Sequence, residues 1–366
     1  MKKTDIAIIG GGPAGLSAAI SAASLGAKIV LIDDGLELGG QLIKQTHKFF
    51  GSEKQFAGIR GIEIARNMIE ELKGLENVEI FKKATVTGYY EDNVITVVRG
   101  AKEDILEKIK AVRIIVAAGA SENMLPFENN DLPGVYGAGA VQTLMNLYGV
   151  VPGKSILMIG AGNIGLIVSY QLLQAGIHVE AIVEALPRIG GYLVHASKIR
   201  RLGVPIYTTH TIKQVYGTEH IEKAVICEID KNFKFIDGTE KELDVDTICL
   251  AVGLSPLSDL LWHAGCKMKY ISELGGYVAL RDDNLKTTKD NIYIAGDVAG
   301  IEEASSAMLE GKIAGLNAAV SLGCSCKDFQ QQNNKLKSEL SELRANPLSE
   351  KVKEGINKVL IKGKRG

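Results

Sequence analysis

The sequence predicts an α/β protein with two similar parallel-sheet domains, the second inserted into the first, and a helical C-terminal tail. One observation is a pattern of strand, glycine turn, helix and strand that opens the chain and returns with an offset of 150 residues. A second is that other apolar runs also end in glycine, as buried strands of a parallel sheet do at its carboxyl edge. The third is the length of 366 residues, which favours more than one domain.

Charge and cysteine content exclude several classes of protein. The 42 lysines and arginines against 43 aspartates and glutamates give a net charge of -1, which argues against nucleic acid or an anionic membrane as a partner. Five cysteines are a sparse and odd number, so we expect a cytoplasmic protein without a disulfide framework. Glycines and polar residues interrupt the uncharged stretches 6–27 and 155–179, so we expect no membrane span. The N-terminal stretch lacks a small-residue cleavage site of the secretory kind, so we expect no signal peptide.

The first pattern, over residues 6–33, has the elements of a Rossmann-like βαβ unit. The run "IAIIG" predicts a buried strand, "PAGLSAAISAASLG" a helix, and "AKIVLID" a second strand. Gly10, Gly12 and Gly15 have the spacing of a fingerprint in which the first glycine makes the turn, the second admits a pyrophosphate and the third permits close packing. The helix N-terminus adds N–H groups that suit phosphate. The sequence therefore predicts a dinucleotide site.

An acidic residue follows this fingerprint. Asp33 lies 18 residues beyond Gly15, at the end of the second strand, where a carboxylate would accept hydrogen bonds from ribose hydroxyls. Asp34 is adjacent and could compete for this role. We favour Asp33 because the strand leads directly to it, whereas Asp34 begins the next turn.

The second pattern, over residues 155–184, repeats the first. Gly160, Gly162 and Gly165 stand 150 residues after their counterparts, which indicates an internal duplication. Glu184 ends this unit, 19 residues beyond Gly165. A carboxylate there accepts hydrogen bonds from a free 2′-hydroxyl and repels a 2′-phosphate, so NAD(H) is favoured over NADP(H). Arg188 nearby is the contrary signal, because an arginine is what a 2′-phosphate would bind.

Further strand endings and a connector set the expected domain boundaries. Strands predicted at 112–120, 246–254 and 291–297 each run into a glycine, and the segment 123–153 contains three prolines. We expect a first domain over residues 1–122 and 255–325, an inserted domain over 123–254, and a helical tail over 326–366.

The tail pattern predicts two helices with one apolar face each. Asn346 and Pro347 supply an N-cap and a first-turn residue for the second helix. We expect both faces to pack on their own chain, the alternative being an interface with another protein. The apolar positions are Leu336, Leu340, Leu343, Val352, Ile356 and Val359.

The order of the motifs resembles that of flavoproteins with two dinucleotide-binding domains, such as thioredoxin reductase and glutathione reductase. "GGGPAG", Asp33, "GGQ", "VAAGA", "GAGNIG", "LAVGLSP" and "YIAGD" occur in that order over residues 1–325. The resemblance implies that the first domain binds FAD, that the inserted domain binds NAD(P)H, and that Gly296 and Asp297 hold the flavin's ribityl chain and phosphate. Ala304 would begin a helix whose N-terminus faces the flavin pyrimidine and stabilises negative charge on the reduced ring.

The fingerprints and the resemblance together give two sets of cofactor-binding residues. Hydride transfer between two cofactors needs positioning and no general base, so we assign no catalytic residue. His47 is the candidate for modulating a proton near the flavin, the alternative being a loop histidine bonded to backbone. The FAD set is Gly10, Gly12, Pro13, Ala14, Gly15, Asp33, Gly40, Gln41, Val86, Gly119, Gly296, Asp297 and Ala304. The NAD(H) set is Gly160, Gly162, Asn163, Ile164, Gly165, Glu184 and Gly253.

The chain departs from the disulfide reductases because it contains no Cys-x-x-Cys pair. Dithiol chemistry is therefore not expected. Cys324 and Cys326 are the one close pair, and two further ligands of a metal or iron–sulfur site are missing. We interpret both as ordinary thiols and expect no metal site.

The connecting segments resemble more closely the α-type subunits of hetero-oligomeric amine and amino-acid dehydrogenases. The segments "GASENMLPFENNDLPGVYGAGAVQTLMNLYGVVPGKSILMIGAGNIG" and "GDVAGIEEASSAMLEGKIAG" carry this resemblance. The group includes opine oxidase, hydrogen cyanide synthase, proline or hydroxyproline dehydrogenase and sarcosine oxidase. It implies a second flavoprotein subunit that oxidises the amine or amino acid, with a small iron–sulfur protein as a further candidate partner. It also leaves open another adenine nucleotide in place of FAD at the first site.

Three functions fit the sequence. The favoured one is an FAD-dependent, NAD-linked oxidoreductase that serves as the electron-handling subunit of an amine or amino-acid dehydrogenase or oxidase. The alternatives are a stand-alone NADH-dependent flavin reductase without a redox disulfide, and a non-catalytic nucleotide-binding scaffold subunit. Both fingerprints are followed by an acidic residue. This argues against the scaffold function, because a site that has lost its catalytic role has no physical need of the carboxylate.

Overall fold

The computed structural model of the protein describes residues 1–49, 53–100, 102 and 105–361. The chain divides into two compact units: unit 1 comprises Met1–Ser121 and Leu254–Gly366, and unit 2 comprises Glu122–Gly253. Unit 2 is thus an insertion in unit 1. The predicted tail is part of unit 1, and its last residues, 362–366, lie outside the described residues. The chain leaves unit 1 through β7 (Ala120–Glu122) and returns to it through β16 (Leu254–Pro256).

Unit 1 is built on a seven-stranded sheet in the order β3-β2-β1-β6-β5-β4, with β19 also paired to β6. The strands β3, β2, β1, β6 and β19 are parallel, whereas β4 and β5 form an antiparallel extension that starts from the first half of β6. The side chains of β2 are buried throughout, as expected of a strand covered on both faces. The bounds are β1 Lys2–Ile9, β2 Ile29–Ile32, β3 Val78–Phe81, β4 Ala84–Tyr90, β5 Val94–Arg99, β6 Ile105–Val116 and β19 Ile292–Ile294.

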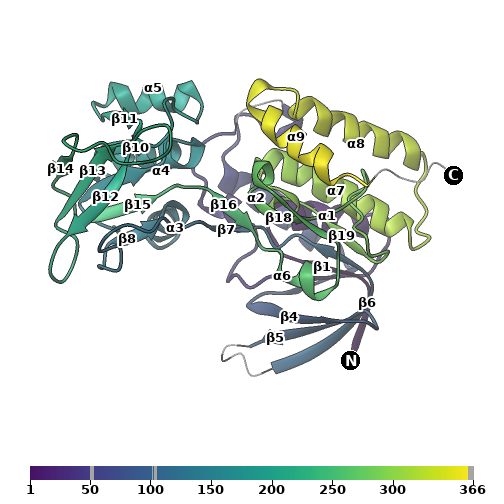
Figure 1. Ribbon diagram of the computed structural model, residues 1–366. Helices are drawn as coiled ribbons and strands as arrows, with labels where there is room; N and C mark the ends of the chain where they lie inside the picture. The colour runs from purple at the N-terminus through teal and green to yellow at the C-terminus, as the bar shows by residue number, and fades with distance from the viewer. Residues whose placement is uncertain (50–52, 101, 103–104, 362–366) are drawn as a thin grey trace. The chain divides into compact units, whose positions relative to one another are not determined.

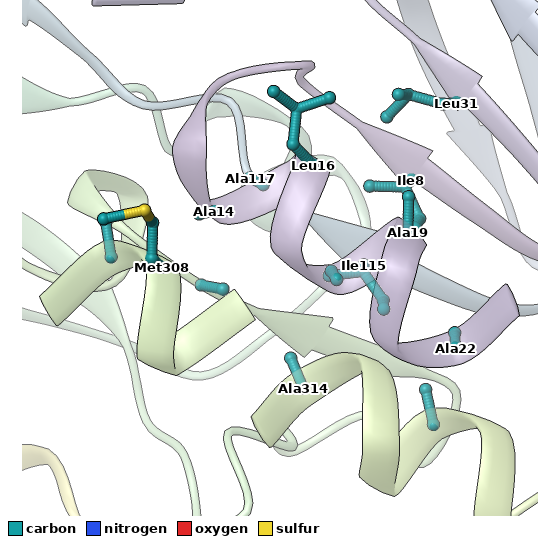
Figure 2. Close-up of a cluster of buried hydrophobic side chains, with 14 of the residues drawn as sticks. Ile8, Ala14, Leu16, Ala19, Ala22, Leu31, Ile115, Ala117, Met308 and Ala314 are labelled. Atoms are coloured by element: carbon teal, nitrogen blue, oxygen red, sulfur yellow. The ribbon is translucent and has the colours of Figure 1, made fainter. Parts of the chain in front are cut away.

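Helices α1 (Pro13–Ala23) and α7 (Ala304–Val320) pack side by side on this sheet, although almost 300 residues separate them (Figure 1). A Cβ on Gly311 of α7 would lie 2.1 Å from the carbonyl oxygen of Ala14, and one on Gly315 would lie 2.4 Å from that of Ala18. Only glycine at these positions lets the two backbones approach so closely. Figure 2 shows Ala14, Ala19 and Ala22 of α1 beside Met308 and Ala314 of α7 in the resulting core.

The other elements of unit 1 include the two tail helices. Leu340 is buried and Leu336 and Leu343 are packed against the main core, while Ile356 and Val359 are buried in a smaller cluster. The apolar faces of the tail therefore pack on unit 1, as expected. The bounds are α2 Gly61–Lys73, α6 Asp259–His263, β17 Met268–Ile271, β18 Gly276–Ala279, α8 Phe329–Leu343 and α9 Glu350–Val359, with 3₁₀ turns at Gly40–Lys44, Glu53–Gln55, Ser272–Leu274, Asp297–Ala299 and Pro347–Ser349.

Unit 2 repeats the plan of unit 1. Its parallel sheet has the order β11-β10-β9-β15-β8, and a separate antiparallel sheet has the order β12-β13-β14. The strand that carries the fingerprint, β9, again lies between its successor and a strand from much later in the sequence. The bounds are β8 Val135–Gly137, α3 Ala138–Tyr148, β9 Ser155–Ile159, α4 Asn163–Gln174, β10 His178–Glu184, α5 Leu193–Arg201, β11 Ile206–Thr208, β12 His210–Tyr216, β13 Lys223–Glu228, β14 Lys241–Leu243 and β15 Thr247–Leu250.

The predicted fold class is confirmed. Both units are α/β, both are built around a Rossmann-like βαβ unit, and the described C-terminal region is helical. Among the described residues, the helices are all too short or too polar to cross a bilayer.

Candidate nucleotide-binding sites

The first glycine of the first fingerprint makes the turn at the end of β1. Gly10 has a φ of 103°, and its N–H donates to the carbonyl of Ile32 over 2.8 Å. A Cβ on Gly10 would lie 2.2 Å from the carbonyl oxygen of Ala117, just beyond the end of β6. Because the chain continues from β1 to β2 on one side while β6 flanks β1 on the other, Gly10 lies where the strand order reverses. Open α/β sheets bind ligands at this point.

The other two glycines of this fingerprint differ in how much room surrounds them. A Cβ on Gly15 would lie 1.7 Å from the carbonyl oxygen of Gly10, so the third glycine is required by packing. A Cβ on Gly12 would lie 3.9 Å from the Cα of Gly40, an ordinary contact, so the second glycine borders open space. Gly12 is the N-cap of α1 and makes no side-chain cap, with Pro13 and Ala14 in the first turn. This combination suits the approach of a pyrophosphate to the helix N-terminus.

The second fingerprint reproduces this geometry in unit 2. Gly160 has a φ of 107°, and a Cβ on Gly165 would lie 2.0 Å from the carbonyl oxygen of Gly160. A Cβ on Gly162 would meet no atom within 4 Å. Asn163 and Ile164 form the first turn of α4, and Ile164 is 41% exposed. The same division therefore recurs, with the third glycine required by packing and the second beside open space.

The Asp33 carboxylate is anchored to the first fingerprint. Its Oδ2 accepts the N–H of Gly11 over 2.5 Å, and its Oδ1 accepts the N–H of Gly35 over 2.9 Å. Burial raises the pKa of Asp33 above its ordinary value, and the two N–H donors oppose this shift. Each carboxylate oxygen has a second lone pair, so both can still accept a hydrogen bond from a ribose hydroxyl.

The Glu184 carboxylate has the equivalent anchor in the second fingerprint. Its Oε2 accepts the N–H of Ala161 over 2.9 Å, and its Oε1 accepts the N–H of Leu186 over 2.9 Å. In both units, therefore, the acid is held by the middle residue of the glycine turn and by its own backbone two residues later. The duplication extends to the hydrogen bonds that orient the acids.

The glycine pair Gly39 and Gly40, which follows Asp33, contacts the first fingerprint. The N–H of Gly39 donates to the carbonyl of Gly11 over 2.8 Å. Gly40 has a φ of 52°, and its Cβ would lie 2.8 Å from the Cα of Gly12. The exposed Gln41 follows in the 3₁₀ turn. This pair lies beside the predicted pyrophosphate position.

Sequence reasoning missed the matching pair in unit 2. Gly190 and Gly191 stand 151 residues after the first pair, so continuing the offset would have found them. The N–H of Gly191 donates to the carbonyl of Ala161 over 2.9 Å. The Asn163 side chain also accepts the N–H of Tyr192 over 2.8 Å, which fixes the turn against the start of α4.

The predicted Gly-Asp pair lies beside the first fingerprint. Gly296 has a φ of 76°, and a Cβ there would lie 2.8 Å from the Cβ of Ala14. The Asp297 carboxylate accepts the N–H of Glu302 over 3.3 Å, and α7 begins at Ala304 soon afterwards. Residues far apart in the sequence thus meet at one edge of the sheet.

Comparison with known protein families identifies the one to which the chain belongs. The sequence profile of the family described as pyridine nucleotide-disulphide oxidoreductase matches residues 4–311. The chain belongs to this family. It is therefore a flavin-dependent oxidoreductase, of a family that works with a flavin and a nicotinamide nucleotide, and the expected superfamily resemblance is confirmed.

The chain is also similar to named proteins of the family. It is 28% identical to the alpha subunit of sarcosine oxidase from Rhizobium meliloti, covering 88% of this chain and 31% of that protein. It is 27% identical to an opine oxidase subunit of Agrobacterium tumefaciens, covering 87% of this chain and 66% of that protein. A crystal structure of L-proline dehydrogenase from P. horikoshii superposes with a TM-score of 0.70 at 26% identity, covering 91% of this chain and 59% of that one. The chain thus spans between about a third and two thirds of these three relatives.

The family name includes disulphides, but the cysteines of this chain do not fit a redox disulfide. All five are free thiols, and Cys227, Cys249 and Cys266 are buried. Burial raises the pKa of Cys249 and of Cys266 above its ordinary value, which disfavours the reactive thiolate. The three buried thiols are therefore unsuited to dithiol chemistry, whereas Cys324 and Cys326 are partly exposed.

Two further residues predicted for the first site lie in or after strands of the unit 1 sheet. The side chain of Val86, in β4, packs against the core cluster that includes Ile9 and Ile32. Gly119 follows β6 with a φ of 78°, and its carbonyl accepts the N–H of Leu257 over 3.0 Å. Contact of either residue with a nucleotide stays a prediction.

Two further predicted residues lie in loops. Gly253, at the end of unit 2, has a φ of 106°, and its carbonyl accepts the N–H of Asn123 over 3.0 Å. The ring of His47 stacks on Phe49 with centroids 5.9 Å apart. A role for His47 in proton transfer likewise stays a prediction.

Asp297 gives unit 1 a distinctive pH dependence. Burial raises its pKa from 3.8 to about 6, and the charges of Glu310 and Glu302 add to the shift. Because the folded-state pKa is the higher one, the stability this group contributes is fully present below pH 3.8 and is lost as the pH rises through about 6. We expect the free energy of unfolding of the wild type to fall, relative to Asp297→Asn, by at most about 3 kcal/mol across this range.

This expectation can be checked by urea unfolding at several pH values. The single tryptophan, Trp262, lies in unit 1, so its fluorescence reports that unit. Asp290→Asn, at a fully exposed carboxylate, is the control. A difference between wild type and Asp297→Asn that stays constant with pH would contradict the assignment.

Proposed function

We propose that this chain is the electron-handling subunit of an amine or amino-acid dehydrogenase or oxidase, with FAD in unit 1 and NAD(H) in unit 2. The observation that carries the proposal is the pairing of two complete fingerprints, each with an anchored acid, in a chain without a redox cysteine pair. Two nucleotide sites suit a relay between a flavin and a nicotinamide. Because the chain has no redox dithiol, the electron donor or acceptor that completes this relay is another molecule.

The residues of unit 1 fit FAD. The open space at Gly12 and the uncapped start of α1 suit the pyrophosphate, and Asp33 has free lone pairs for the ribose. Gly296 and Asp297 would hold the ribityl chain, with the start of α7 near Ala304 directed at the flavin pyrimidine. A helix N-terminus favours negative charge there.

The residues of unit 2 fit NAD(H). Gly162 offers the same open space, and Glu184 accepts hydrogen bonds from a free 2′-hydroxyl while repelling a 2′-phosphate. Arg188 lies four residues further and is exposed. When both cofactors are bound, they supply hydride chemistry themselves, and the chain's task is to bind, orient and shield them.

The partner is inferred from the names of the relatives. The sarcosine oxidase and opine oxidase relatives are both named as subunits, and the superposed structure is an L-proline dehydrogenase. These names support a second subunit that oxidises an amine or amino acid and exchanges electrons with this chain. A small iron–sulfur protein stays a further candidate partner, which these names do not address.

An anaerobic titration of the purified chain tests the cofactors. We expect a yellow protein whose visible flavin absorbance is bleached by NADH at lower concentration than by NADPH. A colourless protein that carries only an adenine nucleotide would support the scaffold function instead. Bleaching by NADPH at the lower concentration would overturn the choice of NAD(H).

Isolation from the native host tests the subunit role. An affinity-tagged chain should bring down a second flavoprotein chain, and the complex should reduce its flavins with an amine or amino acid. A homo-oligomer that passes electrons from NADH to an acceptor without a second chain would favour the stand-alone reductase.

A further inference from the structure

Unit 1 contains a buried charge cluster that sequence reasoning did not find, made of Arg281, Asp297, Glu302, Glu310 and Arg344. The side chains of Arg281 and Glu310 are each 2% exposed, and those of Glu302 and Arg344 are 9% and 13% exposed. Charged side chains are almost never this buried unless they are paired. The burial of these side chains therefore depends on how they pair with one another, which the amino-acid composition does not reveal.

Arg344 is the residue that joins the two glutamates. Its Nη2 lies 2.7 Å from Oε1 of Glu310, and its Nε donates to Oε2 of Glu302 over 2.9 Å. Nη2 also bonds to Oε1 of Glu302, so the contact with Glu302 is bidentate. Arg344 is the C-cap of α8, and the helical tail thus supplies this contact.

Glu310 passes the contact on to the predicted flavin site. Its Oε2 accepts the N–H of Gly296 over 2.9 Å. Gly296 packs against Ala14 of the first fingerprint, where even a Cβ would be only 2.8 Å away. A continuous series of contacts therefore runs from Arg344 through Glu310 to the Gly-Asp pair and the start of α1.

Glu302 makes a second series of contacts. Its backbone N–H donates to Oδ1 of Asp297 over 3.3 Å, while its carboxylate is held by Arg344. Glu302 precedes the N-cap of α7, Glu303. One tail arginine thus fixes both the residue that holds Gly296 and the residue that holds Asp297.

Arg344 supplies one of the two cations of the cluster. Arg281 donates to the carbonyl of Ala299 over 2.7 Å and lies 3.8 Å from Glu310, so it is the second cation. Arg281 and Arg344 match Glu302 and Glu310. Without Arg344, one buried cation would face two glutamates and Asp297, and unpaired buried charge is strongly unfavourable.

We propose that Arg344 is a positioning residue of the first nucleotide site. Through Glu310 and Glu302 it holds the Gly-Asp pair and the start of α7 in place, and it keeps excess negative charge away from the bound flavin. The helical tail is therefore a functional part of this site. One test of this inference, the midpoint potential of the bound flavin, rests on the proposed function. The other test, amide exchange of the nucleotide-free protein, does not.

The test replaces Arg344 with methionine and compares Lys337→Met, which removes a more exposed cation of the same helix that pairs with Asp283 over 2.8 Å. In nucleotide-free protein, we expect amide exchange across residues 294–303 to speed up about tenfold in Arg344→Met, because the bonds that fix this segment are lost. In Lys337→Met we expect the wild-type rate.

The second readout is the midpoint potential of the bound flavin. Excess buried negative charge disfavours the reduced, more negative flavin, and a tenfold loss of its relative affinity lowers the potential of the two-electron couple by about 30 mV. Glu302→Gln/Arg344→Met restores the wild-type net charge of the cluster and should recover most of the potential. A purely structural role for Arg344 predicts no recovery, because the double variant lacks both partners.

The inference is overturned if the exchange rates and the flavin potential of Arg344→Met equal those of the wild type. It is also overturned if the flavin potential of the double variant is as low as that of Arg344→Met. If the wild type binds no flavin, the proposed function fails, and the exchange rates of the nucleotide-free proteins alone decide the inference. Should Arg344→Met not fold, Arg344→Lys provides the comparison, because lysine keeps the charge but cannot make the bidentate contact. A smaller acceleration of exchange in the same direction is then expected.

Discussion

Gly12→Ala is expected to leave unit 1 folded while weakening its binding of FAD about a hundredfold. The methyl group has room in the nucleotide-free protein, since its nearest contact would be the Cα of Gly40 at 3.9 Å, and the φ of −75° is ordinary for alanine. It would, however, occupy the space through which a pyrophosphate reaches the helix N-terminus. Losing two hydrogen bonds to a charged group, at about 1.5 kcal/mol each, gives a factor of this size.

Gly162→Ala is the matched variant in unit 2, where a Cβ would meet no atom within 4 Å. It should weaken NADH binding by a similar factor and leave the flavin in place. Flavin fluorescence and isothermal titration with NADH measure the two affinities separately. If either variant loses both nucleotides, or neither, the assignment of one nucleotide to each unit is wrong.

Gly15→Ala is expected to cost unit 1 at least about 3 kcal/mol of stability, at the upper end of the usual penalty for overpacking. A Cβ there would lie 1.7 Å from the carbonyl oxygen of Gly10. The obstacle is backbone, so no side-chain rotation can relieve it. α1 would have to move off the sheet, and the contacts of α1 with α7 would be lost with it.

Gly74→Ala is the control, because its Cβ would meet the Glu71 carbonyl oxygen at an acceptable 3.4 Å and its φ is −74°. Denaturant unfolding followed by Trp262 fluorescence reports unit 1 alone. We expect an unchanged midpoint for Gly74→Ala and a clear decrease for Gly15→Ala. Equal midpoints would show that α1 can shift at little cost.

The predictable part of the fold is the part encoded by local pattern. Gly10, Gly12 and Gly15 reveal a strand, a turn and a helix because each element is written in consecutive residues. The offset of 150 residues then transfers this interpretation to unit 2. Family resemblance supplied Gly296 and Asp297, which local pattern alone does not connect to the first fingerprint.

The charge cluster could not be predicted in this way. Glu310 lies in helix α7, whose residues are mostly small or apolar and buried, and a buried glutamate among them was the available signal. Its partner Arg344 is 34 residues away in a helix with an exposed polar face, where an arginine is unremarkable. Ion pairs between distant elements have no period and no spacing, so only the three-dimensional packing brings them together.

The close packing of α1 against α7 also determines the order in which the chain can be assembled during synthesis. Residues 1–121 leave the ribosome long before α7 is synthesised. Until then, the small-residue face of α1 has no helix packed against it. Unit 2 is one continuous segment and can complete its core in that interval, since domains generally fold as units as they emerge. Unit 1, whose first segment emerges before unit 2, is therefore completed after it, and a truncated product lacking the C-terminal part would leave the small-residue face of α1 exposed.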